Sequence, residues 1–229
     1  MTAPVDIERA RFNMIEQQIR PWDVLDLEIL DLLNVVRRED FVPPAHRGLA
    51  FFDMEIPLLG SSEEAMARGH CMLAPRVEAR LLQELYPRPH EKVLEIGAGS
   101  GHMAALLAHR CQRVITLEIE PQLAAMARAN LQRANVTNAE VREGDGAVGL
   151  PEEAPFDAFL LSGSVPQVPP ALLSQLKVGG RLLAIVGDDP VMRANLVTRT
   201  GETSYTTTQP WDTVAPRLAG FPEPSRFKF

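Results

Sequence analysis

The chain is poor in cysteine, short of basic residues and without long apolar runs, and each shortage excludes a class of protein. Two cysteines, Cys71 and Cys111, cannot build a disulfide framework, so a reduced, cytoplasmic setting is the simplest expectation. Lysine and arginine total 23 against 30 aspartate and glutamate, which disfavours a general nucleic-acid binder. There is no run of about 18 apolar residues and no signal-peptide pattern at the N-terminus. We therefore predict a protein that binds neither nucleic acid nor membranes.

The 229 residues suit one α/β domain with an elaboration. From Lys92 onward, strand-like apolar runs alternate with amphipathic helix-like runs, which predicts a parallel, doubly wound sheet. Strands are expected at 92–96, 113–117, 139–142, 156–161 and 180–186, and helices at 103–110, 121–134 and 170–175.

The two flanks of this alternating region follow other patterns. Apolar residues at helical spacing predict helices at 5–20, 26–36 and 77–85, whereas 53–75 has little regular pattern and is expected to be loop-rich. Near the C-terminus, Thr200-Gly201 between strand-like runs at 195–199 and 202–208 predicts an antiparallel hairpin. We thus expect a single domain over 1–229, with a helical and substrate-loop region at 1–75, a core at 76–215 and a loose tail at 216–229.

The most informative stretch is VLEIGAGSG at residues 93–101, where a strand-like run meets three glycines at alternate positions. Because glycine has no Cβ, the backbone at Gly97, Gly99 and Gly101 can turn tightly and approach a ligand closely. A helix-like run follows at once, and a helix start offers free N–H groups. This pattern is typical of a nucleotide-like cofactor site at the carboxyl edge of an α/β sheet. A plain structural strand–turn–helix would carry the same glycines.

Three acidic residues narrow the choice of cofactor. Glu118 ends the second strand, where a carboxylate can accept hydrogen bonds from both hydroxyls of a ribose. Glu95, just before the glycines, would repel a pyrophosphate but suits an ammonium group. Asp145, in Gly144-Asp145-Gly146 after the third strand, can meet the amino group of adenine. S-adenosylmethionine has a ribose, an adenine, an amino-acid end and no phosphate, so it is the predicted cofactor.

Other chemistries have less support in the sequence. No G-x-x-x-x-G-K-[ST] loop occurs, and Ser100 lacks the flanking glycines of a nucleophile elbow. The pairs His70–Cys71 and His109–Cys111 have no zinc-site partner at standard spacing, so we expect no metal site.

Five stretches of the chain resemble the protein-L-isoaspartate O-methyltransferase family. They are MIEQQIR (14–20), REDFVP (38–43), VLEIGAGSG (93–101), VREGDGAVGLPEEAPFDA (141–158) and PPALLSQLKVGGRL (169–182). The resemblance implies a Rossmann-like methyltransferase sheet with an N-terminal helical addition, S-adenosylmethionine as cofactor, and isoaspartyl residues of damaged proteins as substrate. The cofactor-binding residues expected on this basis are Glu95, Gly97, Gly99, Ser100, Gly101, Glu118, Asp145 and Gly146.

One segment departs from the family pattern. Where the family carries a run like GQTISQP, this chain has GHCMLAP at 69–75, so Leu73 stands at the position of the family's active-site serine. Losing one orienting hydroxyl costs about 2 to 4 kcal/mol if it acts as a single preorganised donor. His70 or Cys71 could supply a replacement donor, and the stretch at 59–68 is longer than the family's short turn. The catalytic residues therefore stay unassigned.

Two alternative functions remain open from the sequence. A methyltransferase of the same fold could use another acceptor, because Leu73 makes the acceptor site more apolar. A cofactor-binding module without turnover would carry the same glycine turn. A nicotinamide-dependent oxidoreductase is a weaker rival, since the third glycine comes one position early for G-x-G-x-x-G. The sequence indicates no particular oligomeric state.

Overall fold

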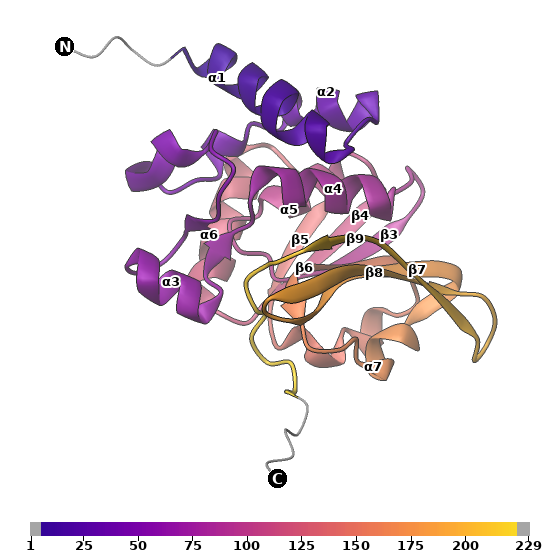
Figure 1. The fold of residues 1–229 in the computed structure, drawn as a ribbon. Coiled ribbons are helices and arrows are strands. Elements are labelled where there is room, and N and C mark those ends of the chain that lie inside the picture. Colours follow the sequence, from indigo (N-terminus) through magenta and orange to yellow (C-terminus); the bar gives the residue numbers. More distant parts are fainter. Residues whose placement is uncertain (1–5, 224–229) are drawn as a thin grey trace.

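The computed structural model describes residues 6–223 and has a central seven-stranded sheet (Figure 1). The strands lie in the order β5-β4-β3-β6-β7-β8-β9, with parallel pairing from β5 to β7 and antiparallel pairing from β7 to β9. This order confirms the predicted parallel sheet with a C-terminal hairpin. The bounds are β3 Lys92–Ile96, β4 Arg113–Glu118, β5 Ala139–Glu143, β6 Phe156–Val165, β7 Leu176–Asp188, β8 Val191–Arg199 and β9 Tyr205–Thr213.

Helices cover the two faces of the sheet unequally. Helices α4 (Pro75–Leu85), α5 (His102–Ala108) and α6 (Pro121–Arg133) pack on one face, and α7 (Pro170–Leu173) lies on the other. Because side chains alternate along a strand, Val93 and Val114 face the larger helical layer while Leu94 and Ile115 face the α7 side. Each face therefore has its own apolar core.

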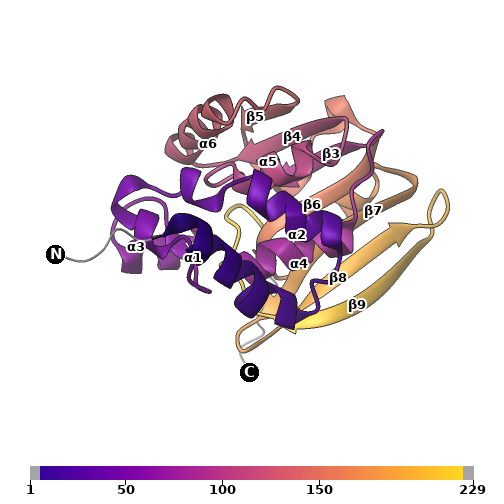
Figure 2. The same cartoon turned by 90° about the horizontal axis from the view of Figure 1, so that it is seen from above.

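The N-terminal segment forms an outer layer over α4 and α5. Helix α1 (Ile7–Met14) continues as a π-helix over Ile15–Ile19, and α2 (Leu27–Val35) follows. Figure 2, seen from above, shows α1 and α2 crossing the α4–α5 side of the molecule. Asp6 and Asp26 begin the two helices by accepting hydrogen bonds from backbone N–H groups, which satisfies otherwise free donors.

Buried ion pairs attach this outer layer to the rest of the molecule. Arg11 on α1 pairs with Glu39, and Arg38 pairs with Glu78 on α4; all four side chains are nearly inaccessible to water. Arg38 also donates to the backbone oxygens of Ala50 (3.1 Å) and Leu73 (2.6 Å). The GHCMLAP segment is thereby fixed to the N-terminal layer through a guanidinium group.

The segment at 53–75 is more regular than expected. It contains a two-residue antiparallel ladder of β1 (Ile56–Pro57) with β2 (Cys71–Met72), and helix α3 (Ser62–Arg68) between them. Helix α3 begins with a capping box of Ser61 and Glu64 and ends at Gly69 in the left-handed region. The prediction of a loop-rich segment was therefore wrong for α3, although the S-x-x-E spacing of the capping box was visible in the sequence.

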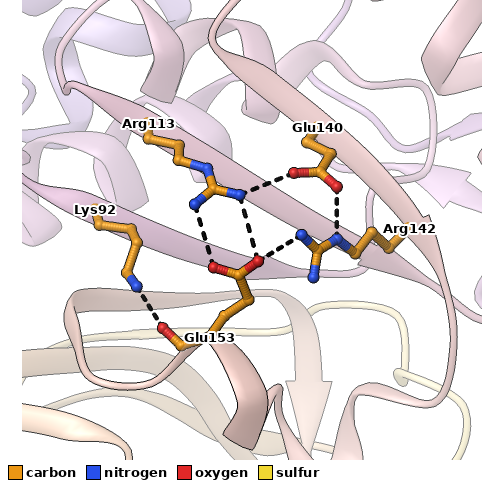
Figure 3. A network of polar contacts seen from close by, with 5 residues as sticks. All are labelled: Lys92, Arg113, Glu140, Arg142 and Glu153. Atoms are coloured by element: carbon orange, nitrogen blue, oxygen red, sulfur yellow. Dashed lines mark hydrogen bonds and ion pairs between the residues drawn. The ribbon is translucent and has the colours of Figure 1, made fainter.

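A network of charged residues lies near the starts of β3 and β4 (Figure 3). We call it the surface network: Lys92, Arg113, Glu140, Arg142 and Glu153. Glu153 accepts from Arg113 (3.1 Å) and Arg142 (2.6 Å), and Glu140 also binds both arginines. Lys92 donates to the backbone oxygen of Glu153. The charges of Arg113 and Arg142 in this network are thus paired with those of Glu140 and Glu153.

The chain after β9 crosses the carboxyl ends of the strands. Ser164 donates its N–H to the carbonyl of Pro216 (2.8 Å), and Leu218 donates its N–H to the carbonyl of Ser164 (2.9 Å). Phe221 is buried in the core of the α7 side. The prediction of a loose tail was wrong for residues 216–221, because these contacts bind them to β6; residues 224–229 lie outside the described part. Within residues 6–223, no helix has the length and apolarity needed to cross a membrane.

Candidate functional site

The glycine turn leaves β3 at the carboxyl edge of the sheet, as predicted. Gly97, Gly99 and Gly101 have φ angles of 93°, 52° and 83°, in the left-handed region that side chains disfavour. The N–H groups of Gly97 and Ala98 both donate to the carbonyl of Leu117, which fixes the turn to β4. A Cβ at Gly101 would lie 3.1 Å from the backbone oxygen of Ala127, so this glycine lets α6 pack closely.

Glu118 at the end of β4 is held beside the turn by backbone donors. Its Oε2 accepts from the N–H of Gly99 (2.8 Å), and its Oε1 accepts from the N–H of Glu120 (3.0 Å). The side chain is nearly buried yet lines the cavity next to the glycines. A carboxylate oriented in this way can still accept further hydrogen bonds, because each oxygen has two lone pairs.

Glu95 lies fully buried beneath the same turn. The hydroxyl of Ser162 on β6 donates to Oε1 (2.7 Å), while Oε2 has no hydrogen-bond partner among the described residues. Burial raises the pKa of Glu95 to about 8, although the neighbouring hydroxyls of Ser162 and Thr116 act in the other direction. A buried carboxyl group with an unused oxygen costs free energy unless a donor or a cation reaches it.

The cavity beside the turn brings together only part of the predicted set. It is lined by Gly97, Gly99, Glu118 and Gly146, and by His70 and Cys71 from the GHCMLAP segment. Glu95, Ser100, Gly101 and Asp145 are not among its lining residues. Ser100 accepts from the N–H of His102 (3.4 Å), and Asp145 accepts from the N–H of Ala147 (2.9 Å). The roles of these four residues toward a cofactor stay predictions.

Residues of the C-terminal segment complete this cavity and were not predicted. Leu218 lies so close to the glycine turn that a Cβ at Gly97 would be 2.7 Å from its Cδ2, and Gly220 lies against the carboxylate of Asp145. The cavity measures about 50 Å³, well below the roughly 300 Å³ at the lower end of small-molecule pockets. Access for a larger ligand therefore depends on where Leu218 lies.

Two residues of the GHCMLAP segment, Leu73 and Cys71, are buried in the structure. Leu73 is buried in the core of the helical side and lines neither the cavity at the glycine turn nor the cleft described next. Burial raises the pKa of Cys71 to about 11, so its thiol stays protonated and is a weak nucleophile near neutral pH. Cys71 also contacts the sulfur of Met66 (3.3 Å). The prediction that His70 or Cys71 supplies a replacement donor stays a prediction.

A larger cleft of about 900 Å³ adjoins the first cavity, and Arg217 lines both. Trp22, Ser164, Asp188 and Asp212 are among its other lining residues. Sequence reasoning missed Ser162, Ser164 and Arg217. The available signal was that Ser162 and Ser164 come directly after the strand predicted at 156–161, since neighbouring parallel strands end at the same edge. In the structure both lie in the last part of β6.

A buried polar cluster supports the turn from behind. His102, the first residue of α5, has its Nδ1 3.0 Å from Oε2 of Glu78, and Glu78 pairs with Arg38. Burial acts against ionisation of Glu78, but His102 and Arg38 hold its pKa below the usual range. The cluster connects the glycine turn to the backbone of Leu73, so two parts of the candidate site share one support.

Comparison with known proteins adds independent information. The sequence profile of the family described as protein-L-isoaspartate(D-aspartate) O-methyltransferase matches residues 9–214. A protein-L-isoaspartate O-methyltransferase of Methanoculleus marisnigri is 40% identical over 179 residues, covering 78% of each chain. One of Staphylothermus marinus is 40% identical over 209 residues, covering 87% of this chain and 89% of that protein.

Two solved structures share the fold. A putative protein-L-isoaspartate O-methyltransferase of Plasmodium falciparum, in complex with S-adenosyl-L-homocysteine, superposes with a TM-score of 0.73 at 18% identity, covering 90% of this chain and 96% of that one. A second protein-L-isoaspartate O-methyltransferase gives a TM-score of 0.74 at 20% identity, with 93% of this chain matched to 66% of a longer one. These likenesses agree with the Rossmann-like methyltransferase sheet expected from the sequence.

Proposed function

The chain belongs to the protein-L-isoaspartate(D-aspartate) O-methyltransferase family, and from this we propose that it methylates the free carboxylate of isoaspartyl residues in damaged proteins. The single observation that carries the proposal is the family match over residues 9–214, which includes both the glycine turn and the N-terminal layer.

The family uses S-adenosylmethionine, and the polar groups at the glycine turn fit that cofactor. Glu118 would hold the ribose hydroxyls, because its carboxylate is already oriented by the N–H groups of Gly99 and Glu120. Glu95 would face the amino-acid end, where a positive charge offsets the cost of ionising a buried carboxyl group. When bound, the cofactor supplies an electrophilic methyl group on a sulfonium sulfur.

The protein's own contribution to this reaction is mainly placement. A carboxylate acceptor, with an ordinary pKa near about 4, is already ionised at neutral pH, so no side chain has to remove a proton. What the chain must do is align the acceptor oxygen with the methyl carbon and the sulfur, and keep water out. Because Leu73 has no hydroxyl, it cannot help to orient the acceptor carboxylate. The methyl-transfer step itself does not require that hydroxyl.

The experiment is methyl transfer to a synthetic isoaspartyl peptide, read as volatile methanol released when the methyl ester hydrolyses. The matched substrate is the same peptide with an ordinary aspartyl residue, and the matched protein is Gly99→Asp. At Gly99 a side chain meets a φ of 52° and the methyl group of Leu58 at 3.3 Å. We expect release only from the isoaspartyl peptide and only with the unmodified protein. Equal release from both peptides, or none, would contradict the proposal.

A methyltransferase with another acceptor remains the second candidate, and Leu73 is the observation that favours it. Labelling of a cell lysate from methyl-labelled cofactor, without methanol release from isoaspartyl peptide, would support this alternative. Stabilisation by S-adenosylhomocysteine with no transfer to any acceptor would instead indicate a binding module; a ligand at 100 times its Kd stabilises a fold by about 2.7 kcal/mol.

A further inference from the structure

The cleft of about 900 Å³ that adjoins the glycine-turn cavity has features of a built binding site. One of its lining groups is the hydroxyl of Ser164, which is fully buried and has no hydrogen-bond partner within residues 6–223. A buried hydroxyl left without a partner costs about 1 to 3 kcal/mol. A ligand with an oxygen acceptor in this cleft would remove that cost.

Arg217 stands where the cleft meets the cavity at the glycine turn. The parallel bridge between Arg217 and Ser164 fixes its backbone to the end of β6. On the other side, a Cβ at Gly69 would collide with the carbonyl oxygen of Arg217, so Arg217 also lies against the start of the GHCMLAP segment. In Figure 2 this yellow segment passes between α3 and β6. Arg217 thus occupies the boundary that a methyl group must cross.

The guanidinium of Arg217 is only partly used by neighbouring residues. Nη2 donates to Asp188 (2.5 Å) and Nε lies 3.5 Å from Glu223. Nη1 is shielded from water and has no partner in the described part of the chain. The other guanidinium of the cleft is occupied: Arg76 pairs with Asp53 and lies 4.2 Å above the ring of Trp22. A carboxylate bound in the cleft could therefore accept a hydrogen bond from Nη1 of Arg217.

The rest of the cleft carries the opposite charge. Glu55, Asp188, Asp189 and Asp212 line it, against the two arginines. Asp188 pairs with Arg217 and Asp212 pairs with Arg193, which lies outside the lining, so part of this negative charge is balanced. Like charges repel and opposite charges attract over distances up to about a Debye length, about 8 Å at physiological salt. Residues next to the acceptor carboxylate therefore experience a negative field, which favours lysine or arginine there and disfavours aspartate or glutamate.

On the basis of the proposed function, we propose that this cleft is the acceptor site, that Arg217 and Ser164 bind the acceptor carboxylate, and that the surrounding acidic residues select isoaspartyl segments with basic neighbours. Arg217 and Ser164 supply the polar contacts that Leu73 lacks. A planar guanidinium suits this role because its N–H donors match the two oxygens of a carboxylate.

The test is equilibrium binding of isoaspartyl peptides in the presence of excess S-adenosylhomocysteine, measured by calorimetry. With a lysine-flanked peptide, we expect Arg217→Met to raise Kd about tenfold or more, and Arg217→Lys to recover part of the loss. Ser164→Ala should raise Kd about threefold or more. The matched control is Arg110→Met, which removes an arginine paired with Glu28 outside the cleft and should leave Kd nearly unchanged. An Arg217→Met protein that binds the peptide like the unmodified one would overturn the proposal.

A second measurement needs no substitution and so remains decisive if a variant fails to fold. The unmodified protein should bind a lysine-flanked isoaspartyl peptide about tenfold more tightly than a glutamate-flanked one, with the difference shrinking at high salt. Changing Asp189 and Asp212 to asparagine should reduce the difference. Equal affinity for the two peptides, or preference for the acidic one, would overturn the proposed selectivity.

The two proposals fail in different ways. Peptide binding that depends on Arg217 without methanol release would contradict the proposed function and leave the acceptor site standing. Methanol release with a KM unchanged in Arg217→Met would contradict the acceptor site and leave the function standing. A change confined to kcat, with KM and Kd unchanged, would likewise count against carboxylate binding by Arg217.

Discussion

The polar side chains at the two ends of the parallel strands differ in how completely they are hydrogen-bonded. Near the starts of β3 and β4, two arginines and two glutamates of the surface network bind one another, and most of these side chains are partly exposed. At the carboxyl ends, Glu95 and Ser164 are fully buried and each keeps an oxygen without a partner in the described chain. The second arrangement leaves buried hydrogen-bonding capacity that the described residues do not use.

The buried cluster of Arg38, Glu78 and His102 shows that burial alone does not mark the site. Its ion pair is nearly inaccessible to water, yet Arg38 directs its donors to Glu78 and to two backbone oxygens. Nε2 of His102 also lacks a partner among the described residues, so an unused buried atom alone does not mark the site either. Glu95 and Ser164 differ from this cluster because they lie on strands at the carboxyl edge of the sheet.

The largest expected effect separates buried from exposed ion pairs. Arg38→Met leaves Glu78 charged and buried, so it should lower the free energy of unfolding by about 3 to 5 kcal/mol. Arg142→Met in the surface network should cost about 1 kcal/mol or less, because water screens exposed pairs. Urea denaturation followed by circular dichroism measures both. Equal losses of unfolding free energy in the two variants would show that the buried and the exposed ion pairs contribute equally to stability.

The next effect concerns the unused carboxyl of Glu95. Burial raises its pKa from an ordinary 4.5 to about 8 in the folded protein. Between those values the folded state binds more protons than the unfolded state, so this group's contribution to stability falls as pH rises through that window. Glu95→Gln removes the titration. At pH 9 the variant should be more stable than the unmodified protein by up to about 4 kcal/mol, with little difference at pH 4.

Urea denaturation of Glu95→Gln and of the unmodified protein between pH 4 and pH 9 measures which of the two is more stable at high pH. The same variant should bind S-adenosylhomocysteine more weakly, because an amide cannot supply the negative charge that the amino-acid end of the cofactor would meet. A variant that gains stability at pH 9 and loses affinity would confirm that Glu95 is held in the fold for ligand binding. Loss of stability at pH 9 would mean that Glu95 is a structural residue.

A third, smaller effect concerns Leu73. Because Leu73 packs in the core and lines neither cavity, Leu73→Ser should cost about 2 to 3 kcal/mol of stability without increasing methyl transfer. Leu73→Ala separates the loss of volume from the added hydroxyl. A rise in kcat/KM for isoaspartyl peptide in Leu73→Ser, absent in Leu73→Ala, would return the acceptor-orienting role to this position and weaken the case for Arg217 and Ser164.

The smallest expected effect concerns Leu218. Its side chain lies over Gly97 and limits the cavity to about 50 Å³, so ligand entry requires it to move. Leu218→Ala should increase the association rate constant of S-adenosylhomocysteine by about threefold to tenfold, as expected when the competent state becomes more populated. Stopped-flow fluorescence can follow this. An unchanged or slower rate would show that Leu218 does not limit entry.

The sequence alone predicted the sheet and some of the residues that line the cavity at the glycine turn. Strand periodicity placed β3 at Lys92–Ile96 as found, and the alternate glycines placed the turn beside Glu118. Local patterns do not report long-range approach, so the contact of Leu218 with Gly97 and the bridge of Arg217 to Ser164 could not be predicted. Both depend on a segment more than 50 residues away from β6 in the chain.

The same limit applies to two predicted cofactor-binding residues that do not line the cavity, and whose roles stay predictions. Gly101 was expected to contact the cofactor, but its missing Cβ makes room for Ala127 of α6. Ser100 is buried behind the turn and accepts from the N–H of His102. A G-x-G-x-G pattern shows that three positions need glycine and does not distinguish helix packing from ligand contact.

The most direct test of the central claim is a competition between two peptides that differ only in one linkage. An equimolar mixture of a lysine-flanked isoaspartyl peptide and its aspartyl isomer is incubated with the protein and S-adenosylmethionine, and methyl esters are located by tandem mass spectrometry. We expect a methyl ester on the isoaspartyl α-carboxylate alone, and less of it with Arg217→Met at a peptide concentration below the Kd of the unmodified protein. Methylation of both peptides, of neither, or of a different group would contradict that claim.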